Sequence, residues 1–484
     1  MTKLDATITV LPIVLGGLIY FFFYPDSVII NRFISNNFQL LVDFKNYIEV
    51  LLPLNIYSKY IQSVPSGLWS FSFIFSQLIV LTKNKRRTSI EKLLLSLNIL
   101  IIICFETFQK KSVNIIPGTY DSNDLILSLL GAFIAFILVV LLIIRINSSG
   151  NEEPFLDEKG NVLPNSIAMH KDMTINGVPQ RITIRGKDKN NPVLLIVHGG
   201  PGAPIFPVIY KITGVDLEDI FTVCYWDQRG SGLAHNDSIP DSSITLTQIV
   251  DDGLELSNHL KKTFKKDKIY IEGLSWGTAV AAYMVQKKPE LYHAYIGSGL
   301  MANQSLSEEL SYEFAMSESQ KHNDSISINQ LKKIGRPPYV KNFKNSVAEA
   351  IEIERKIVVK YAPIKLDADF NFITSIFLDN GLTFKEKFTD MINSPDSYYP
   401  AYKILESNAL DMNLMRDIPE LKVPVYILQG DNDHFTETSV AKTYFDSIIA
   451  PSKKWLLFEN GTHGVQVEYP EKYRSIYINE ILGK

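Results

Sequence analysis

Residues 268–286 read KIYIEGLSWGTAVAAYMVQ: a short apolar run, a turn in which glycines flank a serine, and then a stretch suited to a helix. In a strand–turn–helix of this kind, the glycines allow close backbone packing, and the serine takes a strained conformation that exposes its hydroxyl. A serine that merely caps a helix would account for Ser275, but not for Gly273 and Gly277. We therefore predict that Ser275 is a nucleophile at the end of a strand.

Short apolar runs recur along the chain after residue 165 and alternate with stretches that suit helices. The expected strands are 193–197, 221–225, 268–271, 294–296, 423–428 and 455–458, and a terminal helix is expected in 470–482. Continuous apolar strands that alternate with helices are typical of a parallel sheet covered on both faces. Two earlier strands, 166–174 and 180–185, are joined through Asn176-Gly177, which favours a tight hairpin. The predicted fold class is α/β.

A serine nucleophile needs a base, and an acid that orients the base. In this architecture both follow the serine along the chain, acid first, in loops after later strands. His463 stands in such a loop and fits the base, while Asp433 stands in the preceding one and fits the acid. Asp431 is a rival for the acid, and its other role would be to bond loop amides in a turn. His434 is expected to line the loop or pocket.

The strand at 193–197 ends in His198-Gly199-Gly200-Pro201-Gly202. Glycines at this place let the backbone approach a substrate closely and point an amide at a developing oxyanion, and the amide of Trp276 would be a second donor. A phosphate-binding loop is disfavoured, because the Lys-Ser/Thr ending and the dinucleotide spacing are both missing. His198 is expected to be a structural hydrogen-bonding residue behind the loop.

Three motifs together resemble the proline iminopeptidase group of the α/β-hydrolase superfamily. They are HGGPG at 198–202, DQRGSG at 227–232 and GLSWG at 273–277. The resemblance covers about residues 165–300 and 420–482. It implies an α/β-hydrolase fold with a mostly parallel central sheet and a helical cap. Asp227, Gln228 and Arg229 belong to the second motif, whose role would be to hold loops near the site. A purely structural role is the alternative for these residues.

The same resemblance implies roles for individual residues. Ser275 would be the nucleophile, with Asp433 and His463 completing a catalytic triad. The backbone amides of Gly200 and Trp276 would form the oxyanion hole. This chemistry requires no metal and no organic cofactor.

Residues 301–415 interrupt the second series of strands and are expected to form the helical cap. In the family that the chain resembles, acidic cap residues hold the free amino terminus of the substrate. Glu309 and Glu313 are the candidates here, in a run that also holds Glu308 and Glu318. The alternative interpretation of this run is a solvated helix face.

The first 150 residues differ in composition, with a net charge of +4 against −8 for the remaining 334. Four mostly uncharged, apolar stretches are expected to span a membrane, namely 6–25, 60–82, 93–105 and 125–144. The stretch at 93–105 is short and could instead lie in the interface, and that at 6–25 could be a signal peptide. Loop 83–92 is strongly basic, so the positive-inside rule predicts that it lies in the cytoplasm. With four spans, the C-terminal domain is then expected in the cytoplasm as well.

These observations predict an organisation of five segments. They are an all-α transmembrane region of about four helices over 1–146, a linker over 147–164, the first part of the hydrolase core over 165–300, the cap over 301–415 and the second part of the core over 416–484. Charges are nearly absent from the apolar stretches, which favours an anchor in membrane lipids over a transporter.

Composition excludes several classes of protein. Neither part of the chain is basic enough to suggest binding to nucleic acid. Two cysteines, Cys104 and Cys224, rule out a disulfide scaffold and an all-cysteine zinc site.

We therefore expect a membrane-anchored serine hydrolase that cleaves proline-type N-terminal residues from small peptides through an acyl-enzyme. An esterase or lipase-like hydrolase of small or lipid esters is the alternative within enzymes. A ligand-sensing receptor without catalysis is the alternative from another class, and the intact set of serine, aspartate and histidine argues against it.

Overall fold

The computed structural model describes residues 143–203, 215–236, 238–339, 347–365, 377–392, 404 and 411–483, with 137, 140 and 141 besides. The chain divides into two compact units, Met1–Ile146 and Asn147–Lys484. The apolar stretches expected to span a membrane lie outside the described residues, apart from the end of 125–144, where the described positions are helical. Within the described ranges, no helix combines the length and apolar character needed to cross a bilayer.

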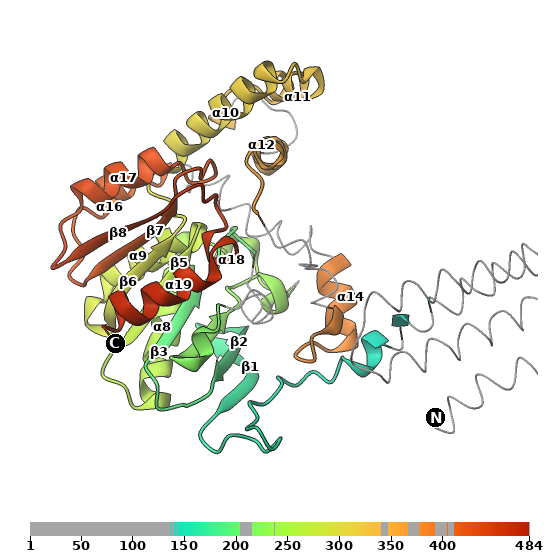
Figure 1. Ribbon diagram of the computed structural model, residues 1–484, viewed down its shortest axis with the longest axis vertical. Helices are drawn as coiled ribbons and strands as arrows, with labels where there is room; N and C mark the ends of the chain where they lie inside the picture. Colours follow the sequence, from blue (N-terminus) through green and yellow to red (C-terminus); the bar gives the residue numbers. More distant parts are fainter. Residues whose placement is uncertain are drawn as a thin grey trace, which may run out of the picture. The chain divides into compact units, whose positions relative to one another are not determined.

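One eight-stranded sheet forms the centre of the second unit, in the order β1-β2-β4-β3-β5-β6-β7-β8 (Figure 1). The strands are β1 (Ile167–Ile175), β2 (Val178–Gly186), β3 (Val193–Val197), β4 (Thr222–Trp226), β5 (Ile269–Leu274), β6 (Tyr292–Ser298), β7 (Val425–Gly430) and β8 (Lys453–Phe458). The pairs β1–β2 and β2–β4 are antiparallel, and every other pair is parallel. The predicted mostly parallel α/β sheet is confirmed.

The hairpin between β1 and β2 turns where the sequence indicates. Asn176 and Gly177 have φ angles of 42° and 83°. A two-residue hairpin turn of this hand needs positive φ at both positions, which asparagine and glycine adopt most readily. The turn sets the register that pairs Ile175 with Val178.

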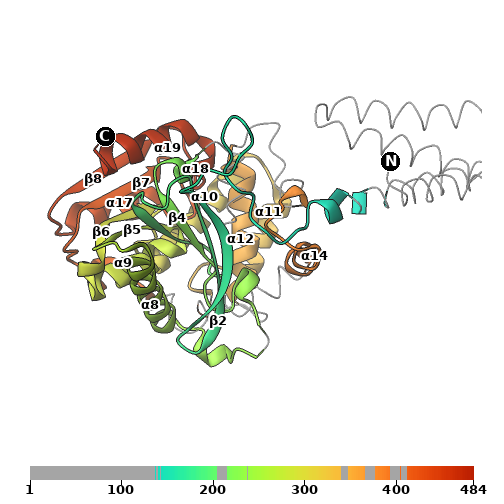
Figure 2. The ribbon, with the colours of Figure 1, turned by 90° about the horizontal axis from the view of Figure 1, so that it is seen from below.

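Helices cover both faces of the sheet. They are α8 (Leu246–Phe264), α9 (Trp276–Lys287), α17 (Thr438–Ser447), α18 (Val465–Glu468) and α19 (Pro470–Ile476), which continues into a π-helical turn at Tyr477–Ile481. Figure 2 shows α8 and α19 on opposite sides of the sheet. Alternate residues of β3 explain the two cores: Leu195 packs into the core under α8, α9 and α17, whereas Leu194 and Ile196 pack into the core under α19.

Between β6 and β7 the described chain is helical. The helices are α10 (Gln304–Lys321), α11 (Ser325–Ile334), α12 (Val347–Tyr361), α14 (Phe384–Ile392) and α16 (Leu414–Asp417). The first three pack on one another on one side of the sheet (Figure 1). Local capping contributes to this arrangement, since the side chain of Asn303 accepts the Leu306 amide and that of Asp324 accepts the Ser327 amide.

The polar segment expected as a linker is bound to the sheet by Arg185 of β2. The Arg185 guanidinium lies 2.6 Å from the Glu152 carboxylate and 3.1 Å from the Glu153 carbonyl oxygen. It also stacks on the Phe155 ring, 4.9 Å from the centroid, and pairs with Glu218 at 3.0 Å. Polar composition predicts a solvated linker, but a buried arginine needs carboxylates around it, and this segment contributes one of them.

The core under α19 contains a buried carboxyl group, that of Glu272 in β5. It accepts a hydrogen bond from the Tyr473 hydroxyl, and no salt bridge of the described residues includes it. Burial raises the pKa of Glu272 to about 7, and hydrogen bonds from Tyr473 and Tyr477 oppose this shift. The native protein therefore takes up a proton here that an unfolded glutamate would already have lost.

We predict that Glu272→Gln removes a pH dependence of stability. The folded-state pKa is about 7 against an ordinary value of 4.5. The contribution of Glu272 to the free energy of unfolding is therefore greatest below pH 4.5, falls as the pH rises, and levels off above about pH 7. The total loss is about 3 kcal/mol. Urea unfolding of both proteins at a series of pH values should show the variant gaining on wild type as the pH rises. Parallel curves at every pH would contradict the assignment.

Candidate active site

Ser275 lies in a strained turn between β5 and α9. Its backbone angles are φ 51° and ψ −119°, a region that residues with a side chain rarely adopt. A β-carbon at Gly273 would lie 2.3 Å from the Gly277 carbonyl oxygen, and one at Gly277 would lie 2.0 Å from that of Val197. Only glycine fits at both flanks, so the strained turn predicted from the sequence is present.

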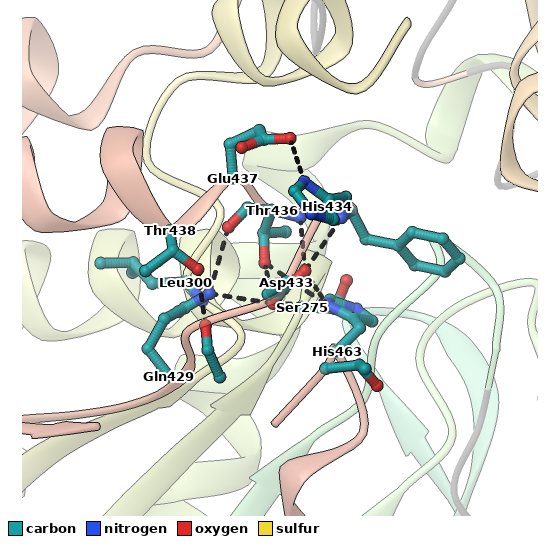
Figure 3. Close-up of polar contacts among 12 residues, drawn as sticks. Ser275, Leu300, Gln429, Asp433, His434, Thr436, Glu437, Thr438 and His463 are labelled. Carbon is teal, nitrogen blue, oxygen red and sulfur yellow. Dashed lines mark hydrogen bonds and ion pairs between the residues drawn. The ribbon is translucent and has the colours of Figure 1, made fainter. Parts of the chain in front are cut away.

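His463 and Asp433 meet in the loops that follow β8 and β7. The Nδ1 atom of His463 lies 2.9 Å from Oδ2 and 3.1 Å from Oδ1 of Asp433 (Figure 3). Because β7 and β8 are parallel neighbours, both loops leave the same edge of the sheet. The rival acid Asp431 is exposed, and its amide donates to the Phe458 carbonyl oxygen. The geometry thus favours Asp433.

Asp433 is buried and ionised. Burial would raise the pKa of this carboxyl, but the charge and hydrogen bond of His463 and the amides of Thr436 and Phe435 outweigh it, so the pKa lies below its ordinary value. A carboxylate in this state accepts the Nδ1 proton of His463 and stabilises the imidazolium that forms during catalysis.

The end of β6 and the residue that follows it contact both Ser275 and His463. The Ser275 amide donates to the Ser298 carbonyl oxygen at 2.9 Å. A β-carbon on the next residue, Gly299, would lie 3.0 Å from Cε1 of His463. Among the described contacts there is no hydrogen bond between the serine hydroxyl and the imidazole, and such bonds often tighten only when substrate binds.

The loop 198–202 packs against the nucleophile. A β-carbon at Gly199 would lie 3.1 Å from Cβ of Ser275. Gly200 has a φ of 111°, and Trp276 is the first residue of α9, so its amide has no acceptor within the helix. These positions suit the two amides to the oxyanion role that the sequence indicates.

Gln228 joins the three sequence motifs. Its side-chain amide donates to the His198 carbonyl oxygen at 2.9 Å and accepts the Trp276 indole N–H at 3.3 Å. Its backbone amide donates to Nε2 of His198 at 3.2 Å. Nδ1 of His198 then donates to the Gly199 carbonyl oxygen at 2.8 Å, and burial lowers the pKa of His198 to about 4. His198 is therefore a neutral structural residue, as predicted.

The neighbouring residues of the second motif have structural partners. Arg229 pairs with the buried carboxylate of Asp252 at 2.8 Å, and Oδ2 of Asp227 accepts the Leu233 amide at 2.9 Å. Across the described residues, no group of three or more histidine, cysteine, aspartate or glutamate side chains is arranged to hold a metal ion.

Glu309 and Glu313 lie on the exposed face of α10, where both pair with Arg336. The structure does not bring either of them to the triad. Glu308 has the opposite environment: it is 1% exposed and faces α12. The physical reason is the helical repeat, which turns successive side chains by about 100° and so separates Glu308 from its neighbour.

Glu308 belongs to a buried cluster beside the triad, and this glutamate was named from the sequence but its partners Glu354 and Arg355 were not. The guanidinium of Arg355 in α12 pairs with Glu308 and lies 3.6 Å from Glu354. It stacks 4.8 Å from the centroid of the Phe435 ring, and that ring packs 4.9 Å from the imidazole of His463. Burial raises the pKa of both glutamates against the opposing charge of Arg355.

One signal in the sequence points to this cluster. Glu354 stands three residues from Ile351 and three from Ile357, within the apolar stripe of α12, where a carboxyl group must be buried. A glutamate on an apolar face needs a partner, which here is Tyr339, whose hydroxyl donates to it.

Comparisons with known proteins agree with this architecture. The profile of the α/β-hydrolase fold matches residues 192–347. A probable aminopeptidase of Bacillus subtilis, YbaC, is 30% identical over 318 residues, which cover 64% of this chain and 94% of that protein. A proline iminopeptidase of Lactobacillus helveticus is 26% identical over 310 residues, covering 62% and 93%. A proline iminopeptidase-related protein of Thermus thermophilus superposes with a TM-score of 0.45 at 15% identity, covering 66% and 98%.

The fold and the site define a serine hydrolase. The chain belongs to the α/β-hydrolase superfamily, with homologues of the proline iminopeptidase type.

We predict that Asp433→Asn lowers the rate of turnover on the order of 10⁴-fold, because the imidazole loses the partner that holds its tautomer. The matched variant Asp431→Asn should retain wild-type turnover. The rate at which a fluorophosphonate labels Ser275 measures the effect without knowledge of the substrate. Equal losses in the two variants would refute the assignment of the acid.

Proposed function

We propose that this protein is an aminopeptidase that releases proline-type N-terminal residues from small peptides. The observation that carries the proposal is the buried acidic cluster of Glu308, Glu354 and Arg355, which lies one aromatic ring away from His463. The relatives named aminopeptidase and proline iminopeptidase support it.

The cluster suits an ammonium group. Glu308 Oε2 and Glu354 Oε1 are buried and accept no hydrogen bond from the described residues. When both glutamates are ionised, they exceed the single guanidinium by one negative charge, and a buried charge without a counter-ion is unfavourable. A substrate ammonium would supply both the charge and the missing donors, and its arrival would favour the ionised form of both glutamates.

The distance to the triad fits an exopeptidase. The Phe435 ring contacts both the Arg355 guanidinium and the His463 imidazole. An amino terminus held at the cluster therefore leaves room for about one residue before the carbonyl that Ser275 attacks. This geometry selects the first peptide bond and disfavours internal ones.

In the proposed mechanism, His463 takes the proton from Ser275 Oγ as the oxygen attacks the substrate carbonyl. Asp433 holds the imidazole and stabilises its positive charge. The amides of Gly200 and Trp276 donate to the oxyanion. His463 then protonates the leaving amine, and the same base activates the water that releases the acyl group.

We predict that Glu308→Gln and Glu354→Gln each lower kcat/KM for prolyl arylamides about 100-fold, because each removes a charge that binds the substrate ammonium. Turnover of a short-chain nitrophenyl ester, which has no ammonium, should stay within a few-fold of wild type. Glu309→Gln, one residue away on the exposed face, is the matched control and should leave both activities unchanged.

The same assay separates peptidase from esterase. Detergent-solubilised full-length protein should cleave prolyl arylamides and spare their N-acetylated forms. Turnover of esters without cleavage of any aminoacyl arylamide would overturn the peptidase proposal and favour the esterase or lipase-like alternative.

We also propose that residues 1–146 anchor the hydrolase in a membrane, with the hydrolase domain in the cytoplasm. The support is the set of apolar stretches and the basic loop at 83–92. A reporter fused after Lys484 should be active only in its cytoplasmic form, and the protein should stay in the membrane fraction after a high-salt wash. An external reporter would contradict the orientation, and release by salt would contradict the anchor.

A further inference from the structure

We propose that Gln429, the penultimate residue of β7, is a positioning residue of the triad that holds the Asp433 carboxylate by anchoring it to the backbone at Leu300. The inference rests on the serine-hydrolase mechanism proposed above. Gln429 is completely buried and lies beside the triad in Figure 3.

Every polar atom of the Gln429 side chain has a partner. Its Nε2 atom donates to Asp433 Oδ2 at 2.9 Å and to the Thr436 carbonyl oxygen at 3.1 Å. Its Oε1 atom accepts the Leu300 amide at 2.9 Å. Since a backbone N–H can only donate, the Leu300 contact fixes which end of the amide is oxygen, and the NH₂ group must face Asp433.

Gln429 differs from the other donors to Asp433 in its origin. The amides of Phe435 and Thr436 donate to Oδ1, and the Thr436 hydroxyl donates to Oδ2. These three belong to the loop that carries Asp433 and would move with it. Among the described residues that donate to this carboxylate, besides His463, Gln429 alone lies outside the loop, on a strand of the sheet. Gln429 therefore connects the Asp433 carboxylate to the central sheet.

The hydrogen bond at Leu300 also connects the acid, through the backbone of residues 298–300, to the nucleophile. Leu300 follows Ser298 and Gly299, and the Ser298 carbonyl oxygen accepts the Ser275 amide. The Gly299 amide donates to Leu428, the residue before Gln429, at 3.0 Å. One short segment thus holds Ser275 on one side and, through Gln429, Asp433 on the other. Removing this link should leave the acid in place but imprecisely oriented.

Gln180 offers a matched control elsewhere in the protein. It is also a buried glutamine held at both ends: Nε2 donates to Asp252 Oδ2 at 2.7 Å, and Oε1 accepts the Trp226 indole N–H at 2.7 Å. Asp252 pairs with Arg229 and is not part of the triad. Replacing either glutamine by methionine removes a similar amide from a similar environment.

The test is the rate constant for fluorophosphonate labelling of full-length wild type, Gln429→Met and Gln180→Met across the pH range. Gln429→Met should label about 10- to 100-fold more slowly. A carboxylate that has lost a hydrogen-bond donor is more basic and stabilises the protonated imidazole more strongly, so the acid limb of the labelling profile should move to higher pH. Gln180→Met should lose stability but keep the wild-type profile. The variant Ser275→Ala, which should not label, assigns the signal to the nucleophile.

The outcomes are distinguishable. Labelling of folded Gln429→Met at the wild-type rate and with the wild-type profile would overturn the role of Gln429 alone. Absence of labelling in wild type would overturn the serine-hydrolase mechanism, and this inference with it. If Gln429→Met does not fold, as judged by circular dichroism, Gln429→Asn replaces it: the amide is kept but is one methylene too short to span Leu300 and Asp433, so the same slowing and shift are expected.

Discussion

The active site depends on the packing of one turn against the end of a neighbouring strand. The backbone around Gly277 lies so close to the Val197 carbonyl oxygen that no β-carbon fits between them. Ser275 is thereby held in a strained conformation, which costs about 1–3 kcal/mol. The strain persists because the buried first turns of α9 pack tightly and stabilise this conformation. The same contact places the HGGPG loop against the nucleophile, so one steric constraint positions both the serine and the amides around it.

The triad is assembled around the short connection from β6 to α10. Ser298 binds the nucleophile's amide, Gly299 leaves space for the imidazole of His463, and Leu300 binds Gln429. Glycine suits this position for two reasons: its φ of 63° is left-handed, and a β-carbon there would lie 3.0 Å from Cε1 of His463. Elements separated by nearly two hundred residues therefore meet at one place in the backbone.

Four buried carboxyl groups show how the surroundings of an acid decide its charge. Asp433 has hydrogen-bond donors and an imidazole, which keep its pKa low in spite of burial. Glu308 and Glu354 share one guanidinium, and burial still raises the pKa of both. Glu272 has phenol groups alone among its described hydrogen-bond partners, and its pKa rises to about 7. Of these four carboxyl groups, the one with the lowered pKa has the most hydrogen-bond donors.

Sequence alone determined the parts of this protein that local chemistry controls: the strands, because apolar runs such as Val193–Val197 are buried on both faces; the hairpin at Asn176-Gly177, because it needs positive φ; and the elbow at Ser275, because its glycines allow close packing. Only the tertiary structure decided between Glu308 and Glu309, assembled Glu354 with Arg355, and made Gln429 a partner of Asp433. Those contacts join residues from different helices and strands, and the number of residues between them does not predict how close they lie in the folded protein.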